Sequence, residues 1–391
     1  MDTGCNKINT VSQGTSAIKV IGNREDNNFA GFVNDKSGNI YTIENQDKAI
    51  ASNDSFFVIK TDPALNVIWR KPIFLHGGLN SGGIIDIGEG LIVQMGSSSA
   101  NAPQLIIARM DYDGNLKWEK TLPMPFTGEG IAGPNQKCLF SGDDAYGAPF
   151  AIETDTGGNI IWTHSYTKGY QSPDQTCRSC SFTKDGGIAF MGFTFWYDTS
   201  GYSYQEAKII KTDGLGNILW TDSIPIYALP NISNIQFLTN AETADGHIVC
   251  TLGSNGGTDG TNFNLAAVIY DKDGKNRKII DLNTHFYFGS VGGDAVFNFF
   301  STSDNSFYAG SIIKTTGTET HYKISIAKFD ANLNKLWNQT YGGNYDLLTG
   351  AVIPYNDGGF LIGSTTAAFG KGRNGNDLLL MRADANGNLV K

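Results

Sequence analysis

Short stretches in which apolar and polar residues alternate follow one another along the whole chain, with turn-forming residues between them. One such pair spans residues 105–110 and 116–120, separated by Asp111-Tyr-Asp-Gly-Asn115. A period of two is typical of β-strands with one buried face, and Asp, Gly and Asn between two such stretches indicate a hairpin turn. No segment combines a sustained helical period with helix caps. The pattern therefore predicts an all-β protein.

The turn phrase occurs seven times, as Asp, then a polar residue four positions later, then usually Trp after three more. The Asp positions are Asp62, Asp111, Asp155, Asp213, Asp271, Asp330 and Asp384. The polar positions are Asn66, Asn115, Asn159, Asn217, Lys275, Asn334 and Asn388. The third positions are Trp69, Trp118, Trp162, Trp220, Lys278, Trp337 and Lys391. A fixed period of a few tens of residues indicates a repeat architecture, and the recurring Trp is expected to pack between units.

A second hairpin precedes each phrase, as at Asp185-Gly-Gly-Ile-Ala and Asp245-Gly-His-Ile-Val, and in the third unit as Gly133-Pro-Asn-Gln. Two hairpins make four antiparallel strands, which we term A to D. Units of about 40–50 residues with four strands are typical of propeller blades. We therefore predict a seven-bladed β-propeller of four-stranded antiparallel blades, with strand A lining the channel and strand D outermost.

The repeat also predicts the domain organisation. Residues 1–15 are expected to form a leader or tether, and residues 16–391 a single propeller domain. The predicted blades span residues 29–75, 76–123, 124–168, 169–225, 226–283, 284–341 and 342–391. Because the chain stops three residues after Asn388, we expect residues 16–21, which alternate like a strand, to close the last blade.

The amino-acid composition limits the kinds of partner that this protein is expected to bind. Charged residues make up 17% of the chain and the formal net charge is −9, so no basic surface for nucleic acid is expected. No apolar run approaches the ~18 residues that span a bilayer, which predicts no transmembrane segment. The Asp-rich turns lack the spacing of a calcium loop, and we expect no metal and no cofactor. We also expect a monomer.

The cysteines leave several alternatives. Gly4-Cys5 resembles the end of a bacterial lipobox, so Cys5 is expected to carry a lipid anchor or to be a free or removed terminal residue. Cys177 and Cys180 point to opposite faces of a regular strand, so a disulfide between them needs a local bend. The alternatives are that disulfide, two unpaired core cysteines, or redox or metal chemistry.

The predicted A–B and C–D turns are short and uniform, whereas the B–C loops differ greatly. Binding residues concentrate on loops, so function is expected on the face of the B–C loops and D–A connections, here called the variable face. Its candidate ligand-binding residues are Trp196, Tyr197, Tyr202, Tyr204, His285, Tyr287, Asp294 and Asp346. The aromatic rings could stack on a sugar, grip a protein partner or pack as a long hairpin, and the two Asp could cap backbone groups or face a ligand.

The phrase Asp-x-x-Gly-Asn-x-x-Trp resembles the repeat of quinoprotein-like β-propellers, including the outer-membrane-assembly lipoproteins. It is more similar still to the Gly-Asn-x-x-Trp…Tyr-Gly-Gly repeats of secreted and surface propellers of Bacteroidetes-type bacteria. The resemblance covers almost the whole chain and implies a propeller of the bacterial envelope or surface, or a secreted one. Asn stands where the quinoprotein repeat usually has Lys, and the adjacent-cysteine pair of several quinone-dependent dehydrogenases is missing, which argues against quinone binding.

Three functions follow from these patterns. The first is a non-catalytic binding or scaffold protein whose variable face binds a glycan or a protein partner, with no catalytic residues. The second is a carbohydrate-active hydrolase or lyase with carboxylates at the channel mouth, for which the candidates are Asp86, Glu129, Asp174, Asp294 and Asp346. The third is an outer-membrane assembly factor, which would require a large apolar patch on the disc.

Overall fold

The structure is a computed structural model that describes residues 9–11, 18–22, 26–47, 55–73, 79–97, 104–123, 130–143, 149–166, 175–197, 203–229, 237–255, 262–287, 298–302, 304–314, 321–369 and 375–390. Within these residues every element is a strand except the short 3₁₀ helix η1 (Ile226–Ala228). The strands form seven antiparallel sheets, and the prediction of a seven-bladed all-β propeller is confirmed.

Blades 1 to 3 are each built from four strands consecutive in sequence. Blade 1 contains β3 (Asp26–Asn34), β4 (Ile40–Asp47), β5 (Ser55–Thr61) and β6 (Val67–Ile73). Blade 2 contains β7 (Leu79–Asp86), β8 (Leu91–Ser97), β9 (Leu105–Met110) and β10 (Leu116–Leu122). Blade 3 contains β11 (Gly130–Gly133), β12 (Lys137–Asp143), β13 (Pro149–Asp155) and β14 (Ile160–Ser165).

Blades 4 to 6 repeat this arrangement. Blade 4 contains β15 (Gln175–Phe182), β16 (Ile188–Tyr197), β17 (Ser203–Thr212) and β18 (Ile218–Pro225). Blade 5 contains β19 (Phe237–Glu242), β20 (Ile248–Asn255), β21 (Asn262–Tyr270) and β22 (Lys278–Tyr287). Blade 6 contains β23 (Asn298–Ser301), β24 (Phe307–Lys314), β25 (Tyr322–Phe329) and β26 (Lys335–Tyr341).

Blade 7 joins the two ends of the chain. Its strands β27 (Leu347–Pro354), β28 (Phe360–Thr366) and β29 (Asp377–Ala383) are followed outward by β2 (Ile18–Gly22) and then β1 (Asn9–Val11). Strand β2 pairs antiparallel with β29, with Ile18 opposite Met381 and Ile21 opposite Leu378. The fourth strand of this blade therefore comes from the start of the chain, and β1 adds a fifth.

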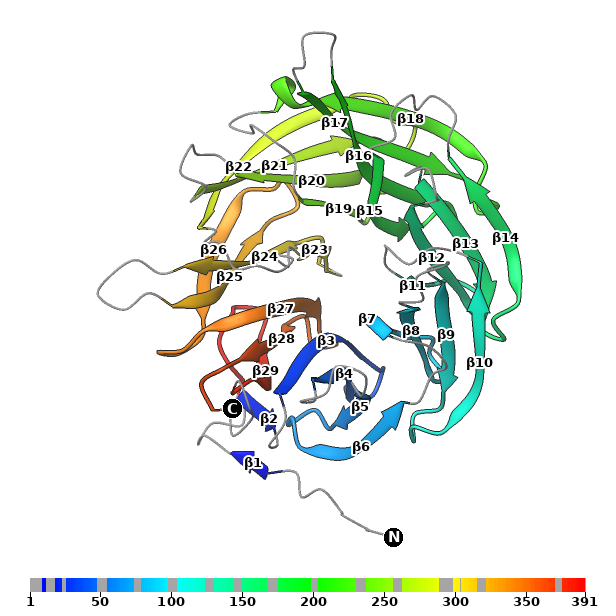
Figure 1. Ribbon diagram of the computed structural model, residues 1–391. Coiled ribbons are helices and arrows are strands. Elements are labelled where there is room, and N and C mark those ends of the chain that lie inside the picture. Colours follow the sequence, from blue (N-terminus) through cyan, green and yellow to red (C-terminus); the bar gives the residue numbers. More distant parts are fainter. Residues whose placement is uncertain are drawn as a thin grey trace.

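The blades surround a central channel, with the first strand of each blade innermost and the last on the outer rim (Figure 1). Hydrophobic clusters of the described residues lie between neighbouring blades and not within single sheets. The ring is therefore held together by blade-to-blade packing, since a single blade cannot bury both of its faces.

Hydrogen bonds explain the repeated Asp and Asn of the C–D turns. In blade 2, Asp111 Oδ1 accepts the backbone N–H groups of Asp113 (3.1 Å) and Asn115 (2.8 Å), and Asp111 Oδ2 accepts the Asn115 amide (3.0 Å). The same Asp-to-Asn bonds recur in blades 1, 3, 4, 6 and 7. The carboxylates therefore accept hydrogen bonds within their own turns.

Four of the five repeated Trp pack on the C–D turn of the next blade, as the sequence predicts for an element between blades, and Trp337 packs on Phe360 of blade 7. A Cβ added to Gly158 of blade 3 would lie 2.7 Å from the Trp118 ring of blade 2, and one added to Gly274 of blade 5 would lie 2.5 Å from Trp220 of blade 4. Only a residue without a side chain fits beneath the ring. Each Gly also has a positive φ, 70° at Gly158 and 71° at Gly274, which Gly adopts readily.

Two blades have Leu at this turn position, and both follow a blade that lacks the Trp. Leu65 of blade 1 follows blade 7, whose outer strand is β2, and Leu333 of blade 6 follows blade 5, which has Lys278 in place of Trp. Both Leu side chains are buried despite positive φ values of 64° and 63°. Leu therefore fills the space that a Trp of the preceding blade occupies elsewhere.

Candidate binding pocket at the mouth of the central channel

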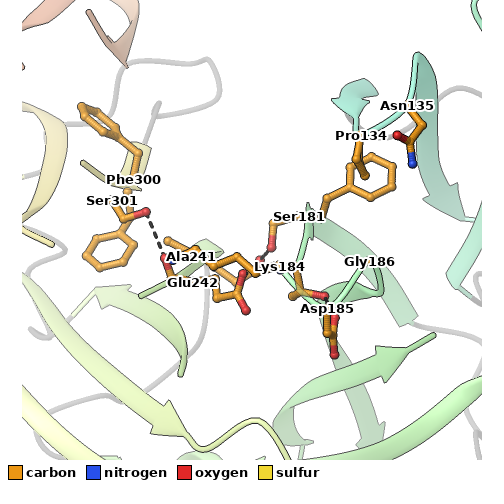
Figure 2. Close-up of a pocket in the computed structure, with 14 residues that line it drawn as sticks. Pro134, Asn135, Ser181, Lys184, Asp185, Gly186, Ala241, Glu242, Phe300 and Ser301 are labelled. Carbon is orange, nitrogen blue, oxygen red and sulfur yellow. Dashed lines mark hydrogen bonds between the residues drawn. The ribbon is translucent and has the colours of Figure 1, made fainter. Parts of the chain in front are cut away.

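A pocket of about 720 Å³ lies where the inner strands of blades 3 to 6 end. Its walls come from the β11–β12 turn, the end of β15 with the turn after it, the end of β19 and the end of β23 (Figure 2). A volume of this size is typical of small-ligand sites. The pocket opens on the face of the A–B turns, opposite to the variable face that the sequence predicts to be functional.

The A–B hairpins determine which residues line this pocket. In blades 4, 5 and 6 the turn begins at Thr183, Thr243 and Thr302, each of which donates its N–H to the carbonyl four residues later. The residue before the turn is the last of the inner strand, where the chain reaches the channel mouth. These residues are Phe182, Glu242 and Ser301, which belong to the lining.

Aromatic rings form the apolar part of the wall. Phe182 lies over Gly133, where an added Cβ would come within 2.4 Å of the ring. Phe299 stacks on Phe307 with centroids 5.2 Å apart, and Phe300 stacks on Tyr308 at 5.3 Å. Phe299 is buried, whereas Phe182 and Phe300 are half-buried. Phe182 and Phe300 therefore line opposite walls of the pocket and are partly exposed, while they also pack on the clusters of blades 3–4 and 6–7.

Polar side chains between these walls join neighbouring blades. Asn240 accepts a hydrogen bond from the Ser181 hydroxyl, and its amide donates to Ser179 Oγ and to the Ala189 carbonyl, both at 3.4 Å. The Ser301 hydroxyl donates to the Glu242 carbonyl at 3.1 Å. These groups hold the pocket in shape, and their remaining lone pairs and protons can face a ligand.

Glu242 lies at the centre of the pocket. Its Oε2 accepts the Lys184 backbone N–H at 2.6 Å, and the Lys184 ammonium donates to the Thr243 carbonyl at 2.8 Å. Burial raises the pKa of Glu242 above its ordinary value, and the Lys184 N–H opposes this rise only in part. The carboxyl group therefore holds its proton more strongly than an exposed glutamate does.

Asp185 lines the same pocket, and its pKa is shifted in the opposite direction. Burial acts to raise the pKa of Asp185, but hydrogen bonds from Thr183, Gly187 and Lys211 outweigh it and lower the pKa below its usual range. The Lys211 ammonium lies 3.1 and 3.0 Å from the two carboxylate oxygens. Asp185 is therefore an ion-paired carboxylate.

The aromatic hairpin of the variable face is described only for its backbone. Trp196 and Tyr197 lie in β16, and Trp196 pairs with Tyr204 of β17, so this hairpin continues past the adjoining strands of the blade. Tyr202 lies outside the described residues, and the side chains of the other three are not described. Ligand binding by this group stays a prediction.

The second predicted patch is described in part. His285 and Tyr287 lie in β22, opposite Asn264 and Asn262, again for the backbone alone. Asp294 lies outside the described residues.

Asp346 is the predicted site residue whose side chain the structure describes. Its Oδ1 accepts the Tyr322 backbone N–H at 2.8 Å and lies 3.3 Å from His321 Nδ1. It therefore caps a backbone group, one of the two roles expected for it. His321, from the start of the third strand of blade 6, is an additional polar residue on the variable face.

Of the remaining candidate carboxylates, Asp86 is described and does not line this pocket. Asp86 accepts the Tyr112 hydroxyl at 2.6 Å and the Gly88 N–H at 3.1 Å, which makes it part of the β7–β8 turn. Glu129 and Asp174 lie outside the described residues.

Cys177 and Cys180 are both buried in this structure, and the alternatives expected for them stay predictions. The register of β15 shifts between Cys177 and Ser179, and this bulge changes the alternation of side chains. Both cysteines consequently lie in one hydrophobic cluster between blades 3 and 4, where a regular strand would point them apart. Cys5 lies outside the described residues.

The described residues lack two further features. They contain no group of three or more His, Cys, Asp or Glu side chains placed to hold a metal ion. Nor do they contain a helix with the length and hydrophobicity needed to cross a membrane.

No protein-family model matches the sequence, and no curated protein sequence is significantly similar to it. Solved structures with a similar fold include a protein of unknown function from Dyadobacter fermentans, with 13% identity, a TM-score of 0.50, and coverage of 94% of this chain and 98% of that one. A prolyl endopeptidase is 11% identical with a TM-score of 0.51, covering 94% of this chain and 48% of its own. The Trypanosoma rangeli sialidase is 10% identical with a TM-score of 0.46, covering 96% and 56%.

The chain thus spans about half the length of the endopeptidase and of the sialidase. At these identities the similarity shows the propeller fold alone. The quinoprotein-like repeat stays a resemblance in sequence pattern.

Proposed function

We propose that this protein is a non-catalytic binding protein, and that the channel-mouth pocket takes a small polar ligand with an apolar face, such as one sugar residue of a glycan. The observation that carries the proposal is the composition of the pocket. Phe182 and Phe300 supply ring faces, and Ser181, Asn240 and Glu242 supply hydrogen-bonding groups between them. A few polar groups within an aromatic wall are typical of ligand sites.

The hydroxyl groups of the pocket are already hydrogen-bonded within the protein, which favours binding over catalysis. The Ser181 and Ser301 hydroxyls donate to Asn240 and to a backbone carbonyl, and neither bond leads to a general base. The Thr183 hydroxyl donates to Asp185 Oδ1 at 2.6 Å, but this carboxylate is paired with Lys211 and its pKa is lowered, which makes it a weak base for activating a nucleophile.

The test is titration of a panel of mono- and oligosaccharides by calorimetry and saturation-transfer NMR. Phe300→Ala is expected to weaken binding about 2- to 13-fold, since an aromatic contact contributes about 0.5–1.5 kcal/mol. The matched control is Val33→Ala, which stands at the corresponding strand position of blade 1, outside the pocket. If Phe300→Ala binds as tightly as the wild type, or if no saccharide in the panel binds, this proposal is wrong.

A second function has one observation in its favour. Glu242 and Asp185 line one pocket with pKa values shifted apart, the arrangement in which one carboxyl acts as an acid and the other stays ionised. A glycoside hydrolase would release a chromophore from aryl glycosides, and Glu242→Gln would abolish turnover. The ion pair between Asp185 and Lys211 ranks this function second, because it occupies both carboxylate oxygens.

The variable face and the cell compartment belong to the proposal on sequence grounds alone. The hairpin with Trp196 and Tyr204 would supply a second surface for a glycan or a protein partner. Secretion or location in the bacterial envelope, with Cys5 as the lipid anchor, would follow from the repeat and lipobox resemblance. Mass spectrometry of the mature N-terminus in the native host tests the anchor.

A further inference from the structure

One carboxylate oxygen of Glu242 is not used by the protein. Glu242 Oε2 accepts the Lys184 backbone N–H at 2.6 Å, whereas Glu242 Oε1 has no hydrogen-bond or ion-pair partner among the described residues. The side chain is half-buried and lies between Ser301 of blade 6 and Asp185 of blade 4 in the pocket (Figure 2). A ligand in the pocket can therefore bind this oxygen.

The other charged groups around the pocket already have partners. Asp185 is paired with Lys211, whose ammonium lies 3.1 and 3.0 Å from the two carboxylate oxygens. Lys184 is exposed to water, and its ammonium donates to the Thr243 carbonyl at 2.8 Å and not to Glu242. Glu242 is less exposed, and its one hydrogen bond comes from a neutral N–H group. Because buried charges in proteins are normally paired, a cationic group of the ligand would supply the partner that Glu242 lacks.

The aromatic wall suits a ligand with such a group. Phe182 and Phe300 line the pocket and are partly exposed. An aromatic ring attracts an ammonium group within about 6 Å of its centroid, and it also takes the apolar face of a sugar ring. The formal net charge of −9 favours the approach of a cation over that of an anion.

We propose that the channel-mouth pocket selects an amino sugar, with the protonated amine on Glu242 Oε1 and the sugar ring against Phe300. This inference rests on the proposed function, because it names the class of sugar that the same pocket would bind. An ammonium forms both a hydrogen bond and an ion pair with the carboxylate, whereas a sugar hydroxyl forms the hydrogen bond alone. Glu242 is therefore the residue that determines specificity.

The ionisation of Glu242 makes this specificity depend on pH. Burial raises the pKa of Glu242, Asp185 also raises it, and the Lys184 N–H and the charges of Lys184 and Lys211 lower it. As the pH falls through this pKa, the carboxyl group becomes neutral and the ligand amine loses its ionic partner. The preference for an amino sugar should therefore be present above the pKa of Glu242 and disappear below it.

Calorimetry of the intact protein with three β1→4-linked disaccharides tests this preference. They are the glucosamine dimer, its N-acetylated form and the glucose dimer, which carry an ammonium, an amide and a hydroxyl group at the same carbon. At pH 7 the wild type is expected to bind the glucosamine dimer at least about tenfold more tightly than the other two. Glu242→Gln should reduce this difference to about twofold or less.

Asp273→Asn is the matched control. Asp273 is an exposed residue of the C–D turn of blade 5 and lies outside the pocket lining. Its substitution removes the same charge from the same face of the molecule. The control variant should keep the preference of the wild type, which separates a contact with Glu242 from a general effect of net charge.

The outcomes separate this inference from the proposed function. Saccharide binding without a preference for the glucosamine dimer, or a preference that persists in folded Glu242→Gln, overturns the inference alone. A preference that falls equally in Asp273→Asn also overturns it. If no saccharide binds, both proposals are wrong.

A pH series on the wild type keeps the test decisive if Glu242→Gln folds poorly. The preference for the glucosamine dimer should shrink between pH 7 and pH 4, because Glu242 takes up its proton. The sugar amine stays protonated over this range, so the change reports on the protein. A preference that is constant from pH 7 to pH 4 overturns the inference.

Discussion

At the scale of single residues, the ionisation of Glu242 in the pocket makes the stability of the protein depend on pH. Its carboxyl group is half-buried between the turns of blades 4 and 5, accepts one backbone N–H, and lies in a pocket with three Phe rings. Because burial raises its pKa, ionisation costs more in the folded protein than in the unfolded chain. The stabilisation by this group is therefore complete below its unfolded pKa and is lost as the pH rises through the folded pKa.

Glu242→Gln removes this ionisation and keeps an oxygen that can accept the Lys184 N–H. We expect the variant to melt at a higher temperature than the wild type at pH 7, and the difference to shrink as the pH falls below the ordinary pKa of glutamate. Thermal melts of both proteins between pH 4 and pH 8 measure it. Parallel melting curves over that range would show that Glu242 is not strained when ionised.

At the scale of elements, each blade is fastened to the next by a small set of contacts around the C–D turn. In blades 1, 2, 6 and 7, a basic residue two positions before the repeated Asp also donates to the carbonyl that follows the Asp of the next blade. The bonds are Lys60 to Tyr112 (3.2 Å), Arg109 to Thr156 (3.4 Å), Lys328 to Ala385 (3.2 Å) and Arg382 to Pro63 (3.0 Å). Blade 5 has Ile269 at this position, and Ile269 packs with Leu333 in the apolar cluster between blades 5 and 6.

Where other junctions have Trp and Gly, the junction between blades 5 and 6 has Lys278 and Leu333. We therefore expect substitutions at these two positions to have strongly coupled effects on stability. Leu333→Gly should destabilise by about 2–5 kcal/mol through a cavity, less about 1 kcal/mol of relieved backbone strain. Adding Lys278→Trp should recover at least about 1 kcal/mol, because the indole ring then has space over the new Gly. Denaturant unfolding of the two single variants and the double variant measures the coupling. Strictly additive effects would show that the ring and the turn do not share one space.

The sequence predicts these elements well and the pocket poorly, for physical reasons. Asp, Asn and Trp act locally or on the adjacent blade, so their chemistry is visible in the repeat itself. Phe182, Glu242 and Ser301 are about 60 residues apart and meet only because the ring closes around them. Each of these residues is the last before an A–B turn, and an alignment of the hairpins would show this shared position. Such an alignment does not show which of the seven equivalent residues line a common pocket.

Irregular backbone limited the prediction in a second way. Cys177 and Cys180 share one cluster because a bulge interrupts β15, and a bulge leaves no mark in the alternation of residue types.

At the scale of the whole molecule, the ring is closed by a short strand. Strand β2 covers the outer side of β29, and its Val20 and Ile21 are buried against different neighbours, in the clusters of blades 6–7 and 7–1. These few side chains join the start of the chain to its end, so the closure depends on their packing.

Ile21→Ala is expected to lower the free energy of unfolding by about 2–4 kcal/mol, as large-to-small substitutions in a core do. Ile18→Ala, on the same strand but half-buried, should cost clearly less. Denaturant titrations of both variants compare them. Equal and small effects would indicate that β2 does not carry the closure.

The proposed ligand site lies where the inner strands of blades 3 to 6 end. Hydrogen–deuterium exchange with and without a saccharide selected by calorimetry tests it most directly. New protection is expected in residues 181–186, 240–242 and 299–301, and it should be weaker in Phe300→Ala at the same saccharide concentration. Protection confined to the hairpin at residues 193–206 or to residues 321–346 would place the ligand on the variable face and show that the channel-mouth pocket is not its site.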